Sequence, residues 1–241
     1  MKLGAEPQRF RDTIASTLDA CSSLEEGAQL FARRFYEAYV QSAVLVRVFA
    51  TFPFSHLSDP DRGSAAEFAS RLRADEPIAD GTPVLTLVGT YGVAEEWRSR
   101  TLSRGHRAIP LVSEAFVAEI PMIARLLTEI GFGDLPRSTS AWQFVRREAG
   151  AAGLFFVGDA RTATDARGRR IIPATDFVDE YGIATVFGFG SYARAETALS
   201  VIVFSRDTLL RSDVEPYVEL RQTLCAHAAR WLDTGARFTQ P

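Results

Sequence analysis

Lysine is almost absent from this sequence. Of the 27 basic residues only Lys2 is a lysine, and the rest are arginines. Together with the abundance of alanine, this preference indicates a GC-rich genome, so we expect a bacterial protein. The formal net charge is also small, at −3. Because binding to nucleic acid depends on an excess of positive charge, we expect no nucleic-acid partner.

Long apolar runs are absent as well. No stretch approaches the roughly 20 apolar residues that a membrane-spanning helix needs. The first ten residues, MKLGAEPQRF, lack the apolar core of a secretory signal peptide. These absences predict a cytoplasmic protein without a membrane partner.

Cysteine and histidine are scarce. Cys21 and Cys225 lie near opposite ends of the chain within helical patterns, where a small thiol usually packs in the core. We expect no disulfide between them in a reducing compartment. The three histidines, His56, His106 and His227, are far apart in the sequence. Neither histidine nor cysteine has the spacing of metal ligands, so we expect no metal site.

Apolar residues, in contrast, are plentiful: they make up 46% of the 241 residues, which is ample for a core. No Pro-, Gly- or Ser-rich linker and no repeat divides the chain, so we expect one domain over residues 1–241. Apolar residues spaced by three and four predict helices within 10–40 and over 214–232. Runs of β-branched and aromatic residues predict a sheet within 43–205, with helices inserted at 113–149.

The final predicted helix has an apolar stripe on one face. The spacing of three and four continues through Tyr217, Leu220, Leu224, His227 and Trp231. Such a stripe can pack on the sheet or against a copy of itself, and two heptads are too few to decide between these partners.

A glycine spacing in FGFGSYARAETALSVIVFS, residues 187–205, is similar to that of a dinucleotide-binding loop. Only residues 191–198 separate Gly190 from the next predicted strand, whereas a parallel crossover needs at least about 10 to 12 residues including its helix. We therefore expect two antiparallel strands and no dinucleotide site. Gly188 and Gly190 would then allow a helix or a ligand to approach the sheet closely, or allow a bulge.

The segment WRSRTLSRGHRAIPL holds the most interesting ionisable residue, His106. Arg100, Ser103, Arg104 and Arg107 surround it in the sequence and are residue types that hold anions. The alternative is a loop histidine that fixes a turn through local hydrogen bonds. A third hypothesis is that His106 ligates a haem iron, and it has no support beyond this single histidine.

Other side chains have two readings as well. Trp97, Tyr181, Phe187 and Phe189 can line an apolar cavity or belong to an ordinary core. Asp176 is one of several acidic residues that can surround a pocket or a cation, or serve as turn and cap residues. No G-x-S-x-G nucleophile elbow is present.

The order of elements in the last third of the chain resembles that of GAF domains of bacterial signal-transduction proteins. The resemblance lies in FVDEYGIATVFGFG and in LSVIVFSRDTLLRSDVEPYVELRQTLCAHAARWL, together with the opening helix before the strand at 43–52. It implies an α+β fold with a central antiparallel sheet of about six strands. The terminal helices would cover one face and short helices and loops the other, with a small molecule bound on the latter side and dimerisation through the terminal helices.

The function that follows is a non-enzymatic sensory domain of bacterial signalling that binds a small molecule or a signalling protein partner and passes its state on through the terminal helices. The candidate ligand-binding residues are Trp97, Arg100, Ser103, His106, Asp176, Tyr181, Phe187 and Phe189. One alternative is an enzyme on the same scaffold, with His106 as acid or base and Arg100 or Arg107 holding an anionic substrate. Another is a structural dimerisation module with a filled interior. GAF-like methionine sulfoxide reductases use loop cysteines, which this chain lacks, and the sequence identifies neither ligand nor cofactor.

Overall fold

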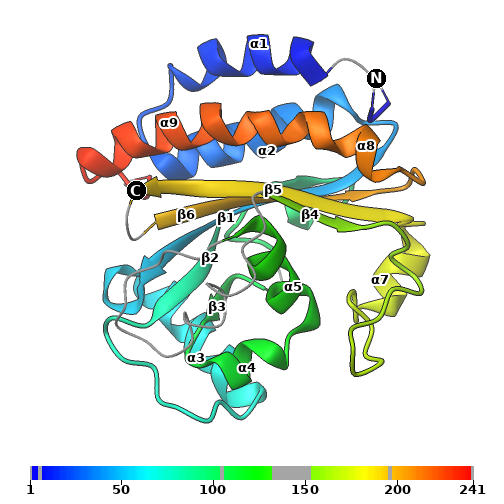
Figure 1. The fold of residues 1–241 in the computed structure, drawn as a ribbon. Helices are drawn as coiled ribbons and strands as arrows, with labels where there is room; N and C mark the ends of the chain where they lie inside the picture. Colours follow the sequence, from blue (N-terminus) through cyan, green and yellow to red (C-terminus); the bar gives the residue numbers. More distant parts are fainter. Residues whose placement is uncertain (1, 5–6, 104–105, 132–152, 195–196, 240–241) are drawn as a thin grey trace.

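A sheet runs through the middle of the molecule, with long helices on one face and shorter helices and loops on the other (Figure 1). The computed structural model describes residues 2–4, 7–103, 106–131, 153–194 and 197–239. This arrangement is the α+β architecture expected from the sequence.

The sheet has six strands in the described part of the chain. They are β1 (Ala43–Pro53), β2 (Pro83–Gly92), β3 (Ala108–Pro110), β4 (Leu154–Val157), β5 (Thr185–Arg194) and β6 (Thr197–Ser205). Their order is β3-β2-β1-β6-β5-β4, and every neighbouring pair is antiparallel. The expected central antiparallel sheet of about six strands is confirmed, with the longest strand, β1, near its centre.

The strands that flank the glycine-rich stretch, β5 and β6, are antiparallel neighbours, with Gly188 opposite Ile202 and Gly190 opposite Ser200. This pairing excludes a dinucleotide-binding unit, which needs parallel strands joined by a helix. A Cβ at Gly190 would lie 2.2 Å from the carbonyl oxygen of Leu199. The same Cβ would lie 3.2 Å from the side chain of Ile130, so the glycine leaves room both for the backbone of β6 and for a helix that covers one face of the sheet.

Three helical segments lie on one side of the sheet, two of them against it and the most N-terminal one outside those two (Figure 1). They are α1 (Pro7–Leu18), α2 (Leu24–Ala38) and a C-terminal segment of α8 (Arg211–Val214), the 3-10 helix η3 (Glu215–Glu219) and α9 (Leu220–Asp233). Ser23 caps α2 by accepting a hydrogen bond from the amide of Glu26 at 3.2 Å. The amides of Leu24 and Glu25 donate to the carbonyls of Ala236 and Arg237 at 3.0 and 3.1 Å. The C-terminal tail thus satisfies amides that a helix start leaves without partners.

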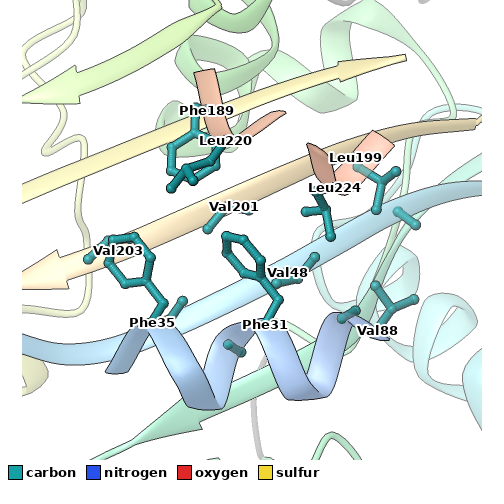
Figure 2. Packing of buried hydrophobic residues seen from close by; sticks show 14 of the residues in the cluster. Phe31, Phe35, Val48, Val88, Phe189, Leu199, Val201, Val203, Leu220 and Leu224 are labelled. Atoms are coloured by element: carbon teal, nitrogen blue, oxygen red, sulfur yellow. The ribbon is translucent and has the colours of Figure 1, made fainter. Parts of the chain in front are cut away.

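The core under these helices is rich in aromatic rings. Figure 2 shows Phe31 and Phe35 of α2 pointing at the valines of the central strands, with Leu220 and Leu224 of α9 beside Phe189 and Leu199. Phe35 is completely buried, and its ring lies 5.2 Å from that of Phe10 and 5.6 Å from that of Tyr217. One ring therefore joins α1, α2 and η3.

The apolar stripe of the final helix packs inside the molecule. All five of its side chains are buried. Trp231 lies over Gly27, where a Cβ would be 2.2 Å from the indole ring, and its Nε1 donates a hydrogen bond to the carbonyl of Cys21 at 3.0 Å. The stripe is therefore not free to pair with a second copy of the chain.

Short helices cover the other face. They are α3 (Asp59–Arg71), η2 (Glu95–Arg98), α4 (Glu114–Ala118), α5 (Pro121–Ile130) and α7 (Thr175–Glu180), while the 3-10 helix η1 (Phe54–His56) directly follows β1. The stretch SDPDRG, which reads as a turn in the sequence, instead starts α3, with Ser58 as its cap. A proline within the apolar helical pattern at 116–130 is predicted either to kink or to divide the helix, and in the structure Pro121 divides α4 from α5. The rest of the helices expected at 113–149 falls within residues 132–152, outside the described residues.

The sequence GLFFVGDARTATDARGRRIIPA, residues 153–174, has the pattern of a hairpin of two strands, but β4 is the only strand that forms there. The second half pairs through an isolated bridge between Thr164 and Arg170. Within the described residues, no helix combines the length and the apolar character needed to cross a lipid bilayer.

Candidate functional site

A cavity lies between the central strands and the short helices that cover them. It has a larger part of about 270 Å³ and a smaller part of about 60 Å³. Arg47, His106, Met122, Pro173 and Phe204 border both parts, so the two adjoin. The larger part approaches the size of pockets that hold small molecules, about 300 to 1,000 Å³.

The lining of the cavity is apolar except for Arg47 and His106. The smaller part is completed by Phe49, Ile109, Ile120, Ile123 and Ile202. The larger part is completed by Leu45, Trp97, Ile172, Ala174 and Phe177. No carboxylate is among these described lining residues, so the fixed charge at the cavity is positive.

Arg47 is the charged residue of β1, in the middle of the apolar run AVLVRVFATF. Alternation along the strand turns Leu45 and Phe49 to the same face as Arg47, and Val46 and Val48 to the helix face. Arg47 therefore reaches the cavity from the centre of the sheet.

The guanidinium of Arg47 has no anionic partner among the described residues. Its Nη2 donates a hydrogen bond to the Oγ of Ser103 at 3.2 Å. Its Nε is buried and has no hydrogen-bond partner in the described chain. Burial lowers the pKa of Arg47 to about 10, because removal from water disfavours the charged form. The group is still protonated at neutral pH, and a desolvated cation without an anion is unfavourable.

Two hydroxyl groups on the same face of the sheet also lack partners. Thr90 is directly opposite Arg47, and Ser200 is directly opposite Phe49. Directly opposed residues of antiparallel strands share a face. The Oγ1 of Thr90 and the Oγ of Ser200 are buried without a hydrogen bond within the described residues. This face thus has polar groups whose hydrogen-bonding capacity is unused.

His106 borders the cavity as a neutral side chain. The residue as a whole is exposed, although its ring packs 5.5 Å from that of Phe68. The pKa of His106 is lowered to about 4, first because surrounding groups shield the ring from water and then because Arg47 and Arg71 carry positive charge. At neutral pH the imidazole can donate one hydrogen bond and accept one.

Replacing His106 with glutamine is expected to flatten the pH dependence of stability on the acid side. The pKa is 6.5 for ordinary histidine and about 4 in the folded protein, so between these values the unfolded chain binds more protons. The free energy of unfolding of the wild type should therefore fall as the pH drops through this window, and the variant should lose that part of the slope. Urea denaturation across the window measures both slopes; equal slopes would contradict a shielded, neutral His106.

Aromatic rings from three segments form a wall at the larger part of the cavity. Trp97 of η2 lies 5.4 Å from Phe177 of α7, which lies 5.3 Å from Phe204 at the end of β6. Tyr181 supports the wall, 4.8 Å from Trp97. Gly92 leaves room for the indole, since a Cβ there would be 2.8 Å from it. The wall offers flat apolar surface to a ligand.

A buried ion-pair network lies beside the cavity, centred on Asp61 of α3. Asp61 is completely buried. Arg100 donates from Nη1 and Nη2 to its two carboxylate oxygens, both at 3.1 Å, and Arg107 donates from Nε at 2.7 Å. Arg100 also pairs with Glu25 of α2 at 3.0 Å, and its guanidinium lies 5.1 Å from the ring of Phe238. The network joins α2, α3, the segment after η2 and the C-terminal tail.

The structure distributes the sequence-predicted site residues over several places. Trp97 and His106 line the cavity, Ser103 holds Arg47, and Tyr181 supports the aromatic wall. Arg100 is engaged by Asp61.

The remaining three residues lie elsewhere. Asp176 is exposed on α7. Phe187 and Phe189 belong to the core on the helix face of β5, on the opposite side of the sheet from the cavity. Arg47 and Asp61, which the sequence analysis missed, hold the charges that define the site.

Metal and thiol chemistry have no assembled site in the described chain. Among these residues, no three His, Cys, Asp or Glu side chains come together to hold a metal ion. Cys21 and Cys225 are buried and unpaired as a disulfide, and burial raises the pKa of the Cys225 thiol to about 12. Cys225 therefore stays a thiol at neutral pH.

The sequence matches no family model and no curated protein, but the structure is similar to solved structures. One is free methionine-R-sulfoxide reductase from Neisseria meningitidis in complex with its substrate, with a TM-score of 0.52, 11% identity, and coverage of 96% of this chain and 93% of that chain. Another is the phycocyanobilin-bound GAF domain from a cyanobacterial phytochrome, with a TM-score of 0.50, 8% identity, and coverage of 95% and 96%. Likeness at such identities concerns the fold and not the activity. The chain has a GAF-like fold.

Proposed function

We propose that this chain is a non-enzymatic sensory domain of bacterial signalling that binds a small molecule in the cavity. The observation that supports the proposal most directly is the lining of the cavity. An apolar space of about 270 Å³ is bordered by the aromatic wall and by two polar side chains, Arg47 and His106. Small-molecule sites typically combine an apolar lining with a few polar groups. In this proposal, residues 1–241 form one domain, and this domain lies in the cytoplasm.

Ligand binding in the cavity is transmitted to the terminal helices through hydrogen bonds of α2. Gln29 of α2 donates hydrogen bonds to the carbonyls of Thr90 at 2.7 Å and Arg98 at 3.0 Å, and accepts one from the amide of Thr90 at 3.1 Å. Arg98 ends the short helix that carries Trp97. A displacement of the aromatic wall would therefore act directly on α2.

The proposed homodimer through the terminal helices uses the outer surfaces of α1 and α9. The apolar stripe from Tyr217 to Trp231 cannot serve because it is buried against the sheet and α2. The mass of the native protein in solution shows how many copies of the chain associate.

The contacts favour binding over the two alternatives. An enzyme that holds an anionic substrate with Arg100 or Arg107 would need those arginines free, and both donate to Asp61. A purely structural module would have a filled interior, whereas this interior retains a cavity.

Native mass spectrometry of gently purified protein tests the proposal. We expect a non-covalent mass that disappears on denaturation. Replacing Met122, which borders both parts of the cavity, with tryptophan should fill the space and raise the Kd by about tenfold or more, corresponding to about 1.4 kcal/mol, so less of the bound mass should remain.

Leu210→Trp is the matched control, because it adds the same side chain at a residue that is 68% exposed and should retain the bound mass. A bound mass that is equal in both variants would place the ligand outside the cavity. A wild-type protein without any bound mass, and without binding to the probes described below, would refute the proposal.

A further inference from the structure

Resting on the proposed function, we propose that the ligand is a small organic monocarboxylate with an aromatic or aliphatic body. Its carboxylate pairs with Arg47, and its body lies against Trp97, Phe177 and Phe204. The inference concerns the chemical class of the ligand, and four features of the cavity lead to it.

The first feature is the contrast between Arg47 and its neighbours. Arg100 and Arg107 share the buried carboxylate of Asp61, at donor distances of 3.1 and 2.7 Å. Arg47 has only the hydroxyl of Ser103, at 3.2 Å, and its Nε is buried without a partner among the described residues. Among the described residues, an anion is therefore present for Arg100 and Arg107 and none is present for Arg47.

The second feature is the shape of the cationic group. A guanidinium presents parallel N–H donors that match the two oxygens of a carboxylate. The buried Nε of Arg47 leaves one such donor unused. A carboxylate at this position would relieve the desolvation of the cation, because an ion pair in a water-poor site interacts more strongly than one in water.

The third feature is the amount of charge. Arg47 and His106 are the polar side chains of the lining, and His106 is neutral because its pKa is about 4. One cation compensates one negative charge. A phosphate monoester, with a charge of about −1.5 to −2 and three acceptor oxygens, would remain undercompensated here, so the lining favours a monoanion.

The fourth feature is the space beyond Arg47. The larger part of the cavity has a volume of about 270 Å³ and an apolar lining. The aromatic wall favours a flat or aliphatic body over a sugar or a peptide, whose hydroxyl and amide groups would lose hydrogen bonds with water.

Matched pairs of probes test the ligand class: benzoate and benzamide, phenylacetate and phenylacetamide, hexanoate and hexanamide. Each pair shares a carbon skeleton and differs in charge. We expect calorimetric titration of the full chain at neutral pH to show that at least one acid binds more tightly than its own amide. Arg47→Met should weaken the binding of that acid by about 30-fold or more, since losing one partner of a buried charge pair has an effect of at least about 2 kcal/mol. Binding of the amide should change by less than about threefold.

Arg71→Met is the matched control. Arg71 is exposed, carries the other positive charge that acts on His106, and lies outside the cavity lining. Its removal should leave the preference for the acid unchanged. A preference that falls equally in both variants would mean a general effect of positive charge and would overturn the role of Arg47.

The stability of ligand-free protein gives a second readout. Arg47→Met removes a desolvated cation and keeps a side chain of similar length, so the midpoint of thermal unfolding should rise by a few degrees. A less stable variant would show that Arg47 already has a stabilising partner within the chain, which would overturn the proposal.

The remaining outcomes separate this inference from the proposed function. If amides bind as tightly as acids, or if Arg47→Met does not change the binding of the acid, the ligand class is wrong while the cavity remains a binding site. If no probe binds, the ligand class is also refuted. In that case, a co-purified mass that is lost in Met122→Trp preserves the proposed function, and its absence refutes both.

Discussion

Replacing Asp61 with alanine is expected to lower the free energy of unfolding by about 3 to 5 kcal/mol. The carboxylate is completely buried and accepts hydrogen bonds from Arg100, Arg107 and the hydroxyl of Ser58, the last at 2.7 Å. Its removal leaves two guanidinium groups close together in a water-poor site without their shared anion. Equilibrium denaturation in urea measures the loss.

Asp59→Ala provides the control for this prediction. Asp59 lies on the same helix and pairs with Arg62, but its side chain is 89% exposed, so its removal should change stability by less than about 1 kcal/mol. An Asp61→Ala protein as stable as the Asp59→Ala protein would mean that water reaches the two arginines and replaces the carboxylate.

Phe35→Ala is expected to have an effect of similar size, about 3 to 5 kcal/mol. The ring is completely buried and contacts Phe10, Tyr39 and Tyr217 with centroid distances of 5.2, 4.9 and 5.6 Å. Truncation loses the transfer free energy of the ring and leaves a hole among aromatic side chains that cannot easily close. Thermal unfolding followed by circular dichroism, with denaturant titration for the free energy, measures the effect.

Leu210→Ala removes an apolar side chain that is 68% exposed, and its effect should stay within about 0.5 kcal/mol. If Phe35→Ala lost less than about 1.5 kcal/mol, the helix layer would have to repack around the missing ring. The helices would then be held to the sheet mainly by the contacts of α9.

Most of the fold could be predicted from the sequence because helices, strands and turns leave local patterns in it. The apolar run at 43–52 predicted a central strand, and the short connection after Gly190 predicted antiparallel neighbours; both agree with the structure. The start of α3 was missed because Ser58, Asp59 and Pro60 favour a turn and a helix start equally well. Only the packing of the following residues decides between the two.

The site was harder to predict because its parts are distant in the sequence. His106 and Trp97 were found as isolated residues, whereas the partner of Arg100 lies 39 positions earlier, at Asp61. A lone arginine in the apolar run AVLVRVFATF was a usable signal for Arg47, because a charge in a central strand needs a reason. The alternation of side chains along β5 places Phe187 and Phe189 on one face of the strand, but it does not show whether that face points to the cavity or to the terminal helices. The sequence therefore could not exclude these two residues from the cavity.

The contacts of Arg100 connect the two layers around the edge of the sheet. Arg100 contacts Asp61 on the cavity side, Glu25 at the start of α2, and the ring of Phe238 in the C-terminal tail. The same tail accepts the amide hydrogen bonds of Leu24 and Glu25. Deuterium uptake at these two amides is therefore a local reporter: it should rise when the tail detaches, well before the chain unfolds as a whole. Hydrogen–deuterium exchange in the first turn of α2 can therefore report ligand binding at the cavity without a label on the ligand.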